Sequence, residues 1–441
     1  MNREVFKSIL LAVLVVASIA MTWNIWFYKT DFKNYKEPSN STNSVAIADS
    51  LPLADVVCPT LALRKTDDKT IGQTEVAKVS DVYRIFRKAR YSSIVLRGRQ
   101  RQVEKKANTV SYEIIFPAPL TAETLTKLFS FTNNRQEIPQ STRIDRIEIY
   151  RPSQGSELTA TFSMQTETDA FSAKVSGIDL NDLAHDFSGN LVEYGTQKLK
   201  GRVVYLPQSS VRVRDEMTYS AKTDIESFIP ILFTDPKNVV HYRGRTAFND
   251  GERQLEETSN ILQYANPNPG ISNSSAAPDP ILHSYEFINS FKAWTNRFIF
   301  DGLNTSSGQS TVIFRLYLNG YRVYNTDFYP NPYLTMMELT WSRQELNAFN
   351  RTLLTFNRID EPQSTTLDSG PDILKSLAAA SVPIREIEDL SIGYRIDKPQ
   401  SQQDYSLKAS PDWFYKIGGR WYSVANALAE HHSGGQKESE R

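Results

Sequence analysis

Few side chains in this sequence are of the types that perform chemistry, and the only nucleophile of note is Cys58. The sequence has five histidines, of which His185, His241 and His283 could serve as the base for Cys58 after folding, whereas those at 431 and 432 lie in a polar tail. However, Cys58 follows the apolar pair Val56 and Val57 and has no base beside it, so a small buried hydrophobic residue is the simpler interpretation. His241 stands in a strand-like stretch and is predicted to be a structural histidine.

Other catalytic patterns are missing from the sequence. Carboxylates occur as adjacent pairs, such as Asp67-Asp68 and Glu256-Glu257, whose side chains would point to opposite sides of a strand, so no glycosidase pair is indicated. The sequence has no Walker loop, dinucleotide fingerprint, serine elbow or penicillin-binding motif. A single cysteine excludes an intrachain disulfide and a Cys-rich metal site. We therefore predict a protein that is not an enzyme, with no catalytic, cofactor-binding or metal-binding residues.

The net charge and the length of the chain bear on its possible partners and on its number of domains. The chain has 441 residues, with 50 Lys and Arg balanced by 50 Asp and Glu. A neutral chain lacks the basic excess that nucleic-acid binding requires, so no nucleic-acid partner is expected. At roughly 150 residues per domain, the length predicts about three domains.

The most informative segment is an apolar run near the N-terminus. Residues 8–27 carry no charge and would span about 30 Å as a helix, the thickness of a membrane's hydrocarbon core. Trp23, Trp26, Phe27 and Tyr28 at its far end are typical of the membrane interface. The alternative is a cleaved signal peptide, because residues 18–20 (SIA) resemble a cleavage site, but apolar residues continue past them. We predict an uncleaved, single-pass transmembrane helix.

The orientation of this helix follows from the length of its flanks. Lys and Arg residues lie on both sides of it, so the positive-inside rule does not decide. A short leader before a single helix most simply places the N-terminus in the cytoplasm and the bulk of the chain outside the cell membrane. Within the helix, Ser8, Ala12, Val16 and Ala20 recur every four residues and could form a face for a partner helix. The alternative is a lipid-facing coincidence.

The rest of the chain alternates between helical and strand patterns. Alternation at 158–164 predicts a half-buried strand, and helical spacing at 121–131 predicts a helix. Asn319-Gly320 between two aromatic-rich strands predicts a type I′ hairpin. The expected fold is α+β, a transmembrane helix followed by three extracytoplasmic domains, of which the last two resemble each other. The predicted parts are a leader and helix (1–28), a linker (29–50), three domains (51–176, 177–280 and 281–431) and a disordered tail (432–441).

Aromatic residues concentrate in the last predicted domain. Such residues can form platforms that bind sugars or proteins, or they can fill a sheet core. The first possibility gives a rival function, a cell-wall polymer-binding module. The cluster consists of Trp294, Phe298, Phe300, Tyr317, Tyr321, Tyr324, Tyr329, Tyr333, Trp341, Trp413, Tyr415, Trp421 and Tyr422.

Five short segments along the chain carry a recognisable combination of residues: 22–26 (TWNIW), 314–324 (FRLYLNGYRVY), 393–395 (GYR), and 411–413 with 419–421 (PDW, GRW). Together they resemble the YycH family, regulators of the WalK (YycG) sensor histidine kinase in Gram-positive bacteria. A proline is common in that family at the place of Arg322, so this turn is expected to differ slightly.

The resemblance implies a role in signal transduction rather than catalysis. It implies a membrane complex with WalK and a companion, YycI, held together largely through transmembrane helices. The family has no catalytic residues to transfer to this chain. Its output is modulation of kinase activity and hence of cell-wall homeostasis.

Overall fold

The structure, a computed structural model, describes residues 46–96, 109–132, 136–153, 156–164, 169–242, 244, 246–269, 277–325, 332–359, 363–396 and 406–438. The predicted transmembrane face and interface aromatics lie outside the described residues: Ser8, Ala12, Val16, Ala20, Trp23, Trp26, Phe27 and Tyr28. Among the helices that are described, none combines the length and apolarity needed to cross a membrane.

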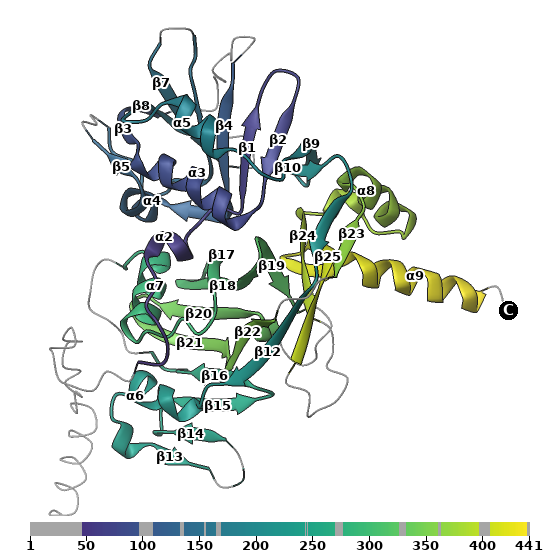
Figure 1. Ribbon diagram of the computed structural model, residues 1–441. Helices are drawn as coiled ribbons and strands as arrows, with labels where there is room; N and C mark the ends of the chain where they lie inside the picture. The colour runs from purple at the N-terminus through teal and green to yellow at the C-terminus, as the bar shows by residue number, and fades with distance from the viewer. Residues whose placement is uncertain are drawn as a thin grey trace, which may run out of the picture. The chain divides into compact units, whose positions relative to one another are not determined.

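The first part of the folded chain is a ten-stranded sheet with the order β10-β9-β2-β1-β4-β6-β7-β8-β3-β5 (Figure 1). Its neighbours are antiparallel except for the parallel pair β3–β5. The strands are β1 (Leu61–Lys65), β2 (Thr70–Gln73), β3 (Arg90–Leu96), β4 (Ser111–Thr121), β5 (Ser130–Phe131), β6 (Arg143–Tyr150), β7 (Leu158–Ser163), β8 (Asp169–Ser176), β9 (Val192–Leu199) and β10 (Arg202–Pro207). The helices here are α2 (Leu53–Val56), α3 (Val76–Lys88), α4 (Ala122–Leu128) and α5 (Leu180–Asp186).

Helix α3 forms much of the core of this part. Val79, Val82, Tyr83 and Phe86 recur at helical spacing and are all buried, so one face of the helix is apolar. The Tyr83 ring meets Phe116 of β4 edge to face at 5.8 Å between centroids. Burial of such side chains away from water is the main stabilising contribution to the fold.

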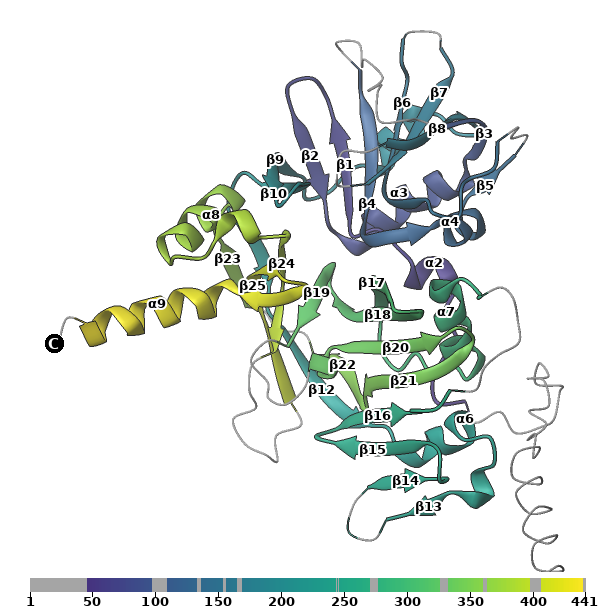
Figure 2. The same cartoon turned by 180° about the vertical axis from the view of Figure 1, so that it is seen from behind.

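The second part is a fourteen-stranded sheet, and Figure 2 shows β16, β21, β20 and β18 side by side within it. Its main order is β13-β14-β15-β16-β21-β20-β18-β19-β24-β25-β12-β22, with β17 beside β18 and β26 beside β25. The strands are β12 (Glu216–Lys222), β13 (Val240–His241), β14 (Ala247–Asn249), β15 (Gln254–Thr258), β16 (Ile261–Ala265), β17 (Phe298–Ser306), β18 (Gln309–Leu318), β19 (Tyr321–Tyr324), β20 (Met336–Ser342), β21 (Glu345–Thr352), β22 (Leu354–Ile359), β24 (Asp389–Ile396), β25 (Ser406–Ile417) and β26 (Arg420–Ser423).

Helices and one small sheet complete this part. The pair β11–β23 (Val211–Arg214 and Ser364–Leu367) forms a separate two-stranded sheet. The α-helices are α6 (Ile229–Leu232), α7 (Pro280–Ser290), α8 (Gly370–Ala379) and α9 (Val424–Glu438), and the 3-10 helices are η1 (Ile225–Phe228), η2 (Pro236–Asn238), η3 (Pro332–Leu334) and η4 (Ile384–Glu386). The architecture is therefore mixed α+β, as predicted.

The predicted hairpin at Asn319-Gly320 is confirmed. Both residues have positive φ, 47° and 91°, and they join β18 to β19. A type I′ turn requires this pair of angles, which Asn and Gly adopt most easily. A second hairpin turns at Gly418 and Gly419, which also have positive φ and join β25 to β26.

The strand pairing crosses two of the predicted domain boundaries. The hairpin β9–β10 lies beyond residue 177 but pairs with β2 of the first sheet. Likewise β16 pairs with β21, so strands on both sides of residue 280 share one sheet. A strand's partner across a long loop leaves no local sequence signal, which explains both differences. In addition, α9 continues to Glu438, past the start of the predicted tail at residue 432.

Buried tyrosines predict how stability depends on alkaline pH. Burial raises the pKa of Tyr205 to about 12 and moves those of Tyr91, Tyr194 and Tyr317 further upward. Each group binds its proton more tightly in the folded state, so its contribution is complete below pH 10 and is lost as pH rises through the folded pKa. Urea titrations should show that the free energy of unfolding falls above pH 10, by about 1.4 kcal/mol per pH unit for each of these tyrosines.

A matched variant tests this assignment. Tyr205→Phe should reduce the slope of that fall between pH 10 and 12, because it removes one of the titrating hydroxyl groups. Burial lowers the pKa of Arg351 to about 9, so deprotonation of this side chain stabilises the folded state as pH rises. This is a single group, and the four buried tyrosines outweigh it. A free energy of unfolding that stays constant from pH 9 to pH 12 would contradict the prediction.

Candidate functional site

A cavity of about 120 Å³ lies where the first sheet meets the second. From the first part, β4, β6, β9 and β10 contribute to its wall, and the β18–β19 turn, β24 and β25 contribute from the second. Its charged lining residues are Arg146, Arg322 and Asp389. This is the candidate functional site.

The β18–β19 turn closes one side of the cavity by a close contact with the first part. The Tyr321 hydroxyl lies 3.2 Å from the Thr74 hydroxyl. A Cβ on Gly320 would lie 2.5 Å from the Thr74 carbonyl oxygen. Glycine is therefore required here twice, for its positive φ and for the close approach of the two backbones.

Arg322 lines the cavity and belongs to a buried charge cluster with Asp301 and Arg315. The Asp301 carboxylate accepts from Arg315 Nε at 2.5 Å through one oxygen and from Arg322 Nη1 at 3.0 Å through the other. A bulge places the carboxylate, because the β17–β18 register shifts between Phe300 and Gly302 and leaves Asp301 as the extra residue. Bulges re-aim a side chain in this way.

The cluster is stabilised by charge and by aromatic faces. Burial alone would raise the pKa of Asp301, but the guanidinium groups of Arg315 and Arg322 hold it below its usual range. Arg315 lies over the Tyr324 ring at 4.7 Å, and Arg322 lies over the Trp421 ring at 5.0 Å. Arg315 and Arg322 share the Asp301 carboxylate, and Asp389 of the cavity lining adds a second negative charge near Arg322.

Arg146 faces the cavity from β6. Its guanidinium lies 5.0 Å from the centroid of the Tyr205 ring, and its Nη2 donates to the Val203 carbonyl. Its Nε is buried and has no hydrogen-bond partner among the described residues. Across the same ring, Lys65 forms ion pairs of 2.8 and 3.5 Å with Glu113 and Glu148.

The aromatic cluster of the last predicted domain is mostly core. Trp294, Trp341 and Trp413 are each at least 96 % buried, and each donates its indole N–H to a protein acceptor. Tyr422 is exposed at 41 %, whereas Trp421 is half-buried and Tyr329 lies outside the described residues. The structure therefore removes most of the surface on which a polymer-binding platform was predicted.

Cys58 is a buried core residue, and His241 and His283 pack on aromatic rings. Cys58 is 7 % exposed, and burial raises the pKa of its thiol to about 11, so it remains protonated at neutral pH. His241 stacks on Phe248, and burial lowers the pKa of His283, which packs on Trp341. Across the described part of the chain, no group of three His, Cys, Asp or Glu side chains could hold a metal ion.

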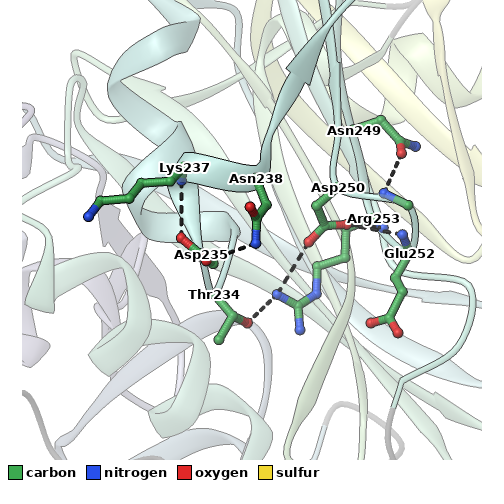
Figure 3. Close-up of polar contacts among 9 residues, drawn as sticks. Thr234, Asp235, Lys237, Asn238, Asn249, Asp250, Glu252 and Arg253 are labelled. Carbon is green, nitrogen blue, oxygen red and sulfur yellow. Dashed lines mark hydrogen bonds and ion pairs between the residues drawn. The ribbon is translucent and has the colours of Figure 1, made fainter.

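A second polar cluster joins the loop after α6 to the β14–β15 turn (Figure 3). Asp235 caps η2 through the Lys237 amide, and Asp250 accepts from the Arg253 amide at 2.7 Å. The Arg253 guanidinium reaches the Thr234 hydroxyl. These contacts bind neighbouring loops to one another, which is a structural role.

Sequence reasoning missed Asp301, Arg146 and the cavity. Arg315 and Arg322 were visible as cations in an otherwise apolar and aromatic hairpin, which is a signal for a buried partner. Nothing local pointed to Asp301, because its position depends on a bulge. Arg146 alternates with Ile147 and Ile149 and could be taken for an exposed residue of a half-buried strand.

Two protein-family models match this chain, and together they cover most of its length. A family model described as the YycH protein, N-terminal domain, matches residues 4–190, and the model for the C-terminal domain matches residues 201–431. The chain belongs to the YycH family. The predicted resemblance is thus confirmed, and the β9–β10 hairpin begins just after the first matched region ends.

A sequence match and a structural match extend the comparison over most of the chain. A YycH-family protein of Bacillus subtilis (strain 168), named two-component system WalR/WalK regulatory protein YycH, is 22 % identical over 97 % of this chain and 98 % of its own. The crystal structure of YycH from Bacillus subtilis matches with a TM-score of 0.71 and 15 % identity, over 86 % of this chain and 98 % of the other. At that identity, the likeness supports the fold alone.

Proposed function

We propose that this chain is a membrane-anchored, extracytoplasmic regulator of the WalK sensor histidine kinase, acting in a complex with a YycI-like companion. The observation that carries the proposal is the family match, which covers residues 4–190 and 201–431. The curated Bacillus subtilis relative, which bears the name of a WalR/WalK regulatory protein, aligns with 97 % of the chain. The buried thiol of Cys58 agrees with a role that is not enzymatic.

The family match also supports the proposed membrane anchor. The N-terminal match begins at residue 4, so the uncharged run at 8–27 lies within it. Such a run is long enough to span a bilayer once as a helix. The proposed topology has a cytoplasmic N-terminus and the two sheets outside the membrane.

The proposed mechanism acts between transmembrane helices. A kinase with at least two states can be biased only by a partner that contacts those states differently. The face of Ser8, Ala12, Val16 and Ala20 presents mostly small side chains at four-residue spacing, which lets another helix approach closely. The extracytoplasmic sheets then tune the position of this helix.

Reconstitution of the kinase in bilayers tests the proposal. Autophosphorylation should change on addition of the full-length chain together with the companion. A peptide of the helix alone should retain part of that effect, and residues 46–441 alone should lose it. An effect carried wholly by the extracytoplasmic part would contradict the proposed helix mechanism, and no effect of the full-length chain would contradict the function.

A second experiment tests the helix face. Replacing Ala12 and Ala20 together by isoleucine should weaken copurification with the kinase, because larger side chains hold the helices apart. Ala17→Ile is the matched control, since it lies roughly a third of a turn from the centre of this face. Equal loss in the control, or unchanged copurification of the double variant, would refute the face assignment.

A further inference from the structure

We infer that the cavity between the two sheets binds a small oxyanion, a phosphate or a carboxylate. Arg146 of β6 and Arg322 of β19 line it from opposite parts of the chain. Their exposures are only 7 % and 8 %. Two guanidinium groups buried to this degree around one space form a site suited to an anion, because planar N–H donors match carboxylate and phosphate oxygens.

An unsatisfied donor on Arg146 supports the site. Its Nη2 is engaged by the Val203 carbonyl, but its buried Nε–H has no partner within the described residues. A buried polar group without a hydrogen bond costs roughly 1–3 kcal/mol, so such groups usually have an acceptor. The Nε atom has no contact with solvent, so a bound oxyanion would supply that acceptor after a turn of the Arg146 side chain.

The excess of positive charge is confined to the lining of the cavity. Three lining residues are charged, the cations Arg146 and Arg322 and the carboxylate of Asp389. The Asp389 carboxylate accepts from the Leu390 amide at 2.9 Å. Behind the lining, Asp301 is shared by Arg315 and Arg322, and Lys65 is shared by Glu113 and Glu148, so that layer balances the charge of the lining. A ligand in the cavity therefore faces two guanidinium groups and one carboxylate.

The size and lining of the cavity limit the ligand. A cavity of about 120 Å³ holds roughly ten water-sized spheres, so a molecule of a few non-hydrogen atoms fits and a polymer does not. Tyr194, Ile392 and Trp413 supply an apolar wall that could cover the organic part of a small phosphate ester or carboxylic acid. The ligand would contact both parts of the chain at once.

Calorimetry on the full-length protein, in a detergent with a sugar headgroup, tests the inference. The probes are inorganic phosphate, glycerol 3-phosphate and acetate, each titrated at constant ionic strength set with chloride. We expect saturable binding of at least one probe. A preference for glycerol 3-phosphate would indicate a phosphate ester, and a preference for acetate a carboxylate. Absence of saturable binding for all three would overturn the inference.

Variants localise the binding. Arg146→Met keeps an unbranched apolar stem but removes the donors, and it should weaken affinity by about tenfold or more. Arg84→Met is the matched control, because Arg84 is an exposed residue of α3 that pairs with Asp81. If Arg146→Met fails to fold, Ser391→Leu, which fills the cavity from β24, should abolish binding. Affinity unchanged by filling the cavity would refute the site.

Discussion

Replacing Asp301 by alanine is expected to lower the free energy of unfolding by about 3–5 kcal/mol. The carboxylate is 4 % exposed and holds both Arg315 and Arg322, which are themselves about 90 % buried. Without it, two guanidinium groups remain in the interior and both lose their ion pair with Asp301. Breaking a buried ion pair from one side is costly for that reason, even where the intact pair adds little.

The measurement is a urea titration of purified protein followed by tryptophan fluorescence. Asp81→Ala is the matched control, because it removes the exposed partner of Arg84 and should change the free energy of unfolding by less than about 0.5 kcal/mol. Asp301→Asn should still be strongly destabilising, since an amide can accept hydrogen bonds but does not neutralise the arginines. Equal stability of Asp301→Ala and the control would contradict the assigned role.

The contact of Asp301 with its two arginines also predicts how stability changes at acid pH. The arginines lower the pKa of Asp301 beneath its usual value, so its contribution to stability is present above about pH 4 and is lost as pH falls through the folded pKa. Between pH 4 and pH 2, wild-type protein should therefore lose its advantage over Asp301→Asn. A constant difference between the two proteins over this range would argue against the ionised carboxylate.

Elements with a local signal were predictable from the sequence. Helical spacing placed a helix at 121–131, and α4 forms at Ala122–Leu128 with Thr121 as its N-cap. Residues 371–380 carry the local signal of a helix with proline in its first turn, and α8 forms there with Pro371 in that position. Residues 384–394 are typical of a strand by composition, but β24 begins only at Asp389, because residues Ile384–Glu386 form the 3-10 helix η4 after Pro383.

Features that depend on distant pairing were not predictable. Asp301 reaches Arg315 and Arg322 only because a bulge in β17 shifts the register with β18. The cavity needs Arg146 and Arg322, which are 176 positions apart, to come to one place. Arg146 carries no pattern that distinguishes a buried cation from a solvated one, and Arg322 is marked only by its place in an aromatic hairpin, which does not say where its partner lies. Aromatic strand residues, in contrast, were correctly weighed as possible core, because aromatic side chains normally cover sheet faces.

The second large effect is expected at Arg351, which is fully buried in β21. Its Nη1 donates to the Ala293 carbonyl at 2.8 Å, and its Nη2 donates to the Thr295 hydroxyl at 2.6 Å. Among the described residues no carboxylate pairs with it, and the Phe228 ring lies 5.2 Å away. Burial lowers its pKa to about 9, so it is still a cation at neutral pH.

Arg351→Ala should therefore lower the free energy of unfolding by about 3–5 kcal/mol, through a large void and the loss of hydrogen bonds to the connection after α7. Arg351→Met should recover roughly half of that loss, because methionine refills the space and removes the desolvated charge. Urea titrations at pH 7 compare the three proteins. If methionine proves as costly as alanine, the hydrogen bonds outweigh packing, and if alanine costs nothing, the buried guanidinium does not hold Ala293 and Thr295 in place.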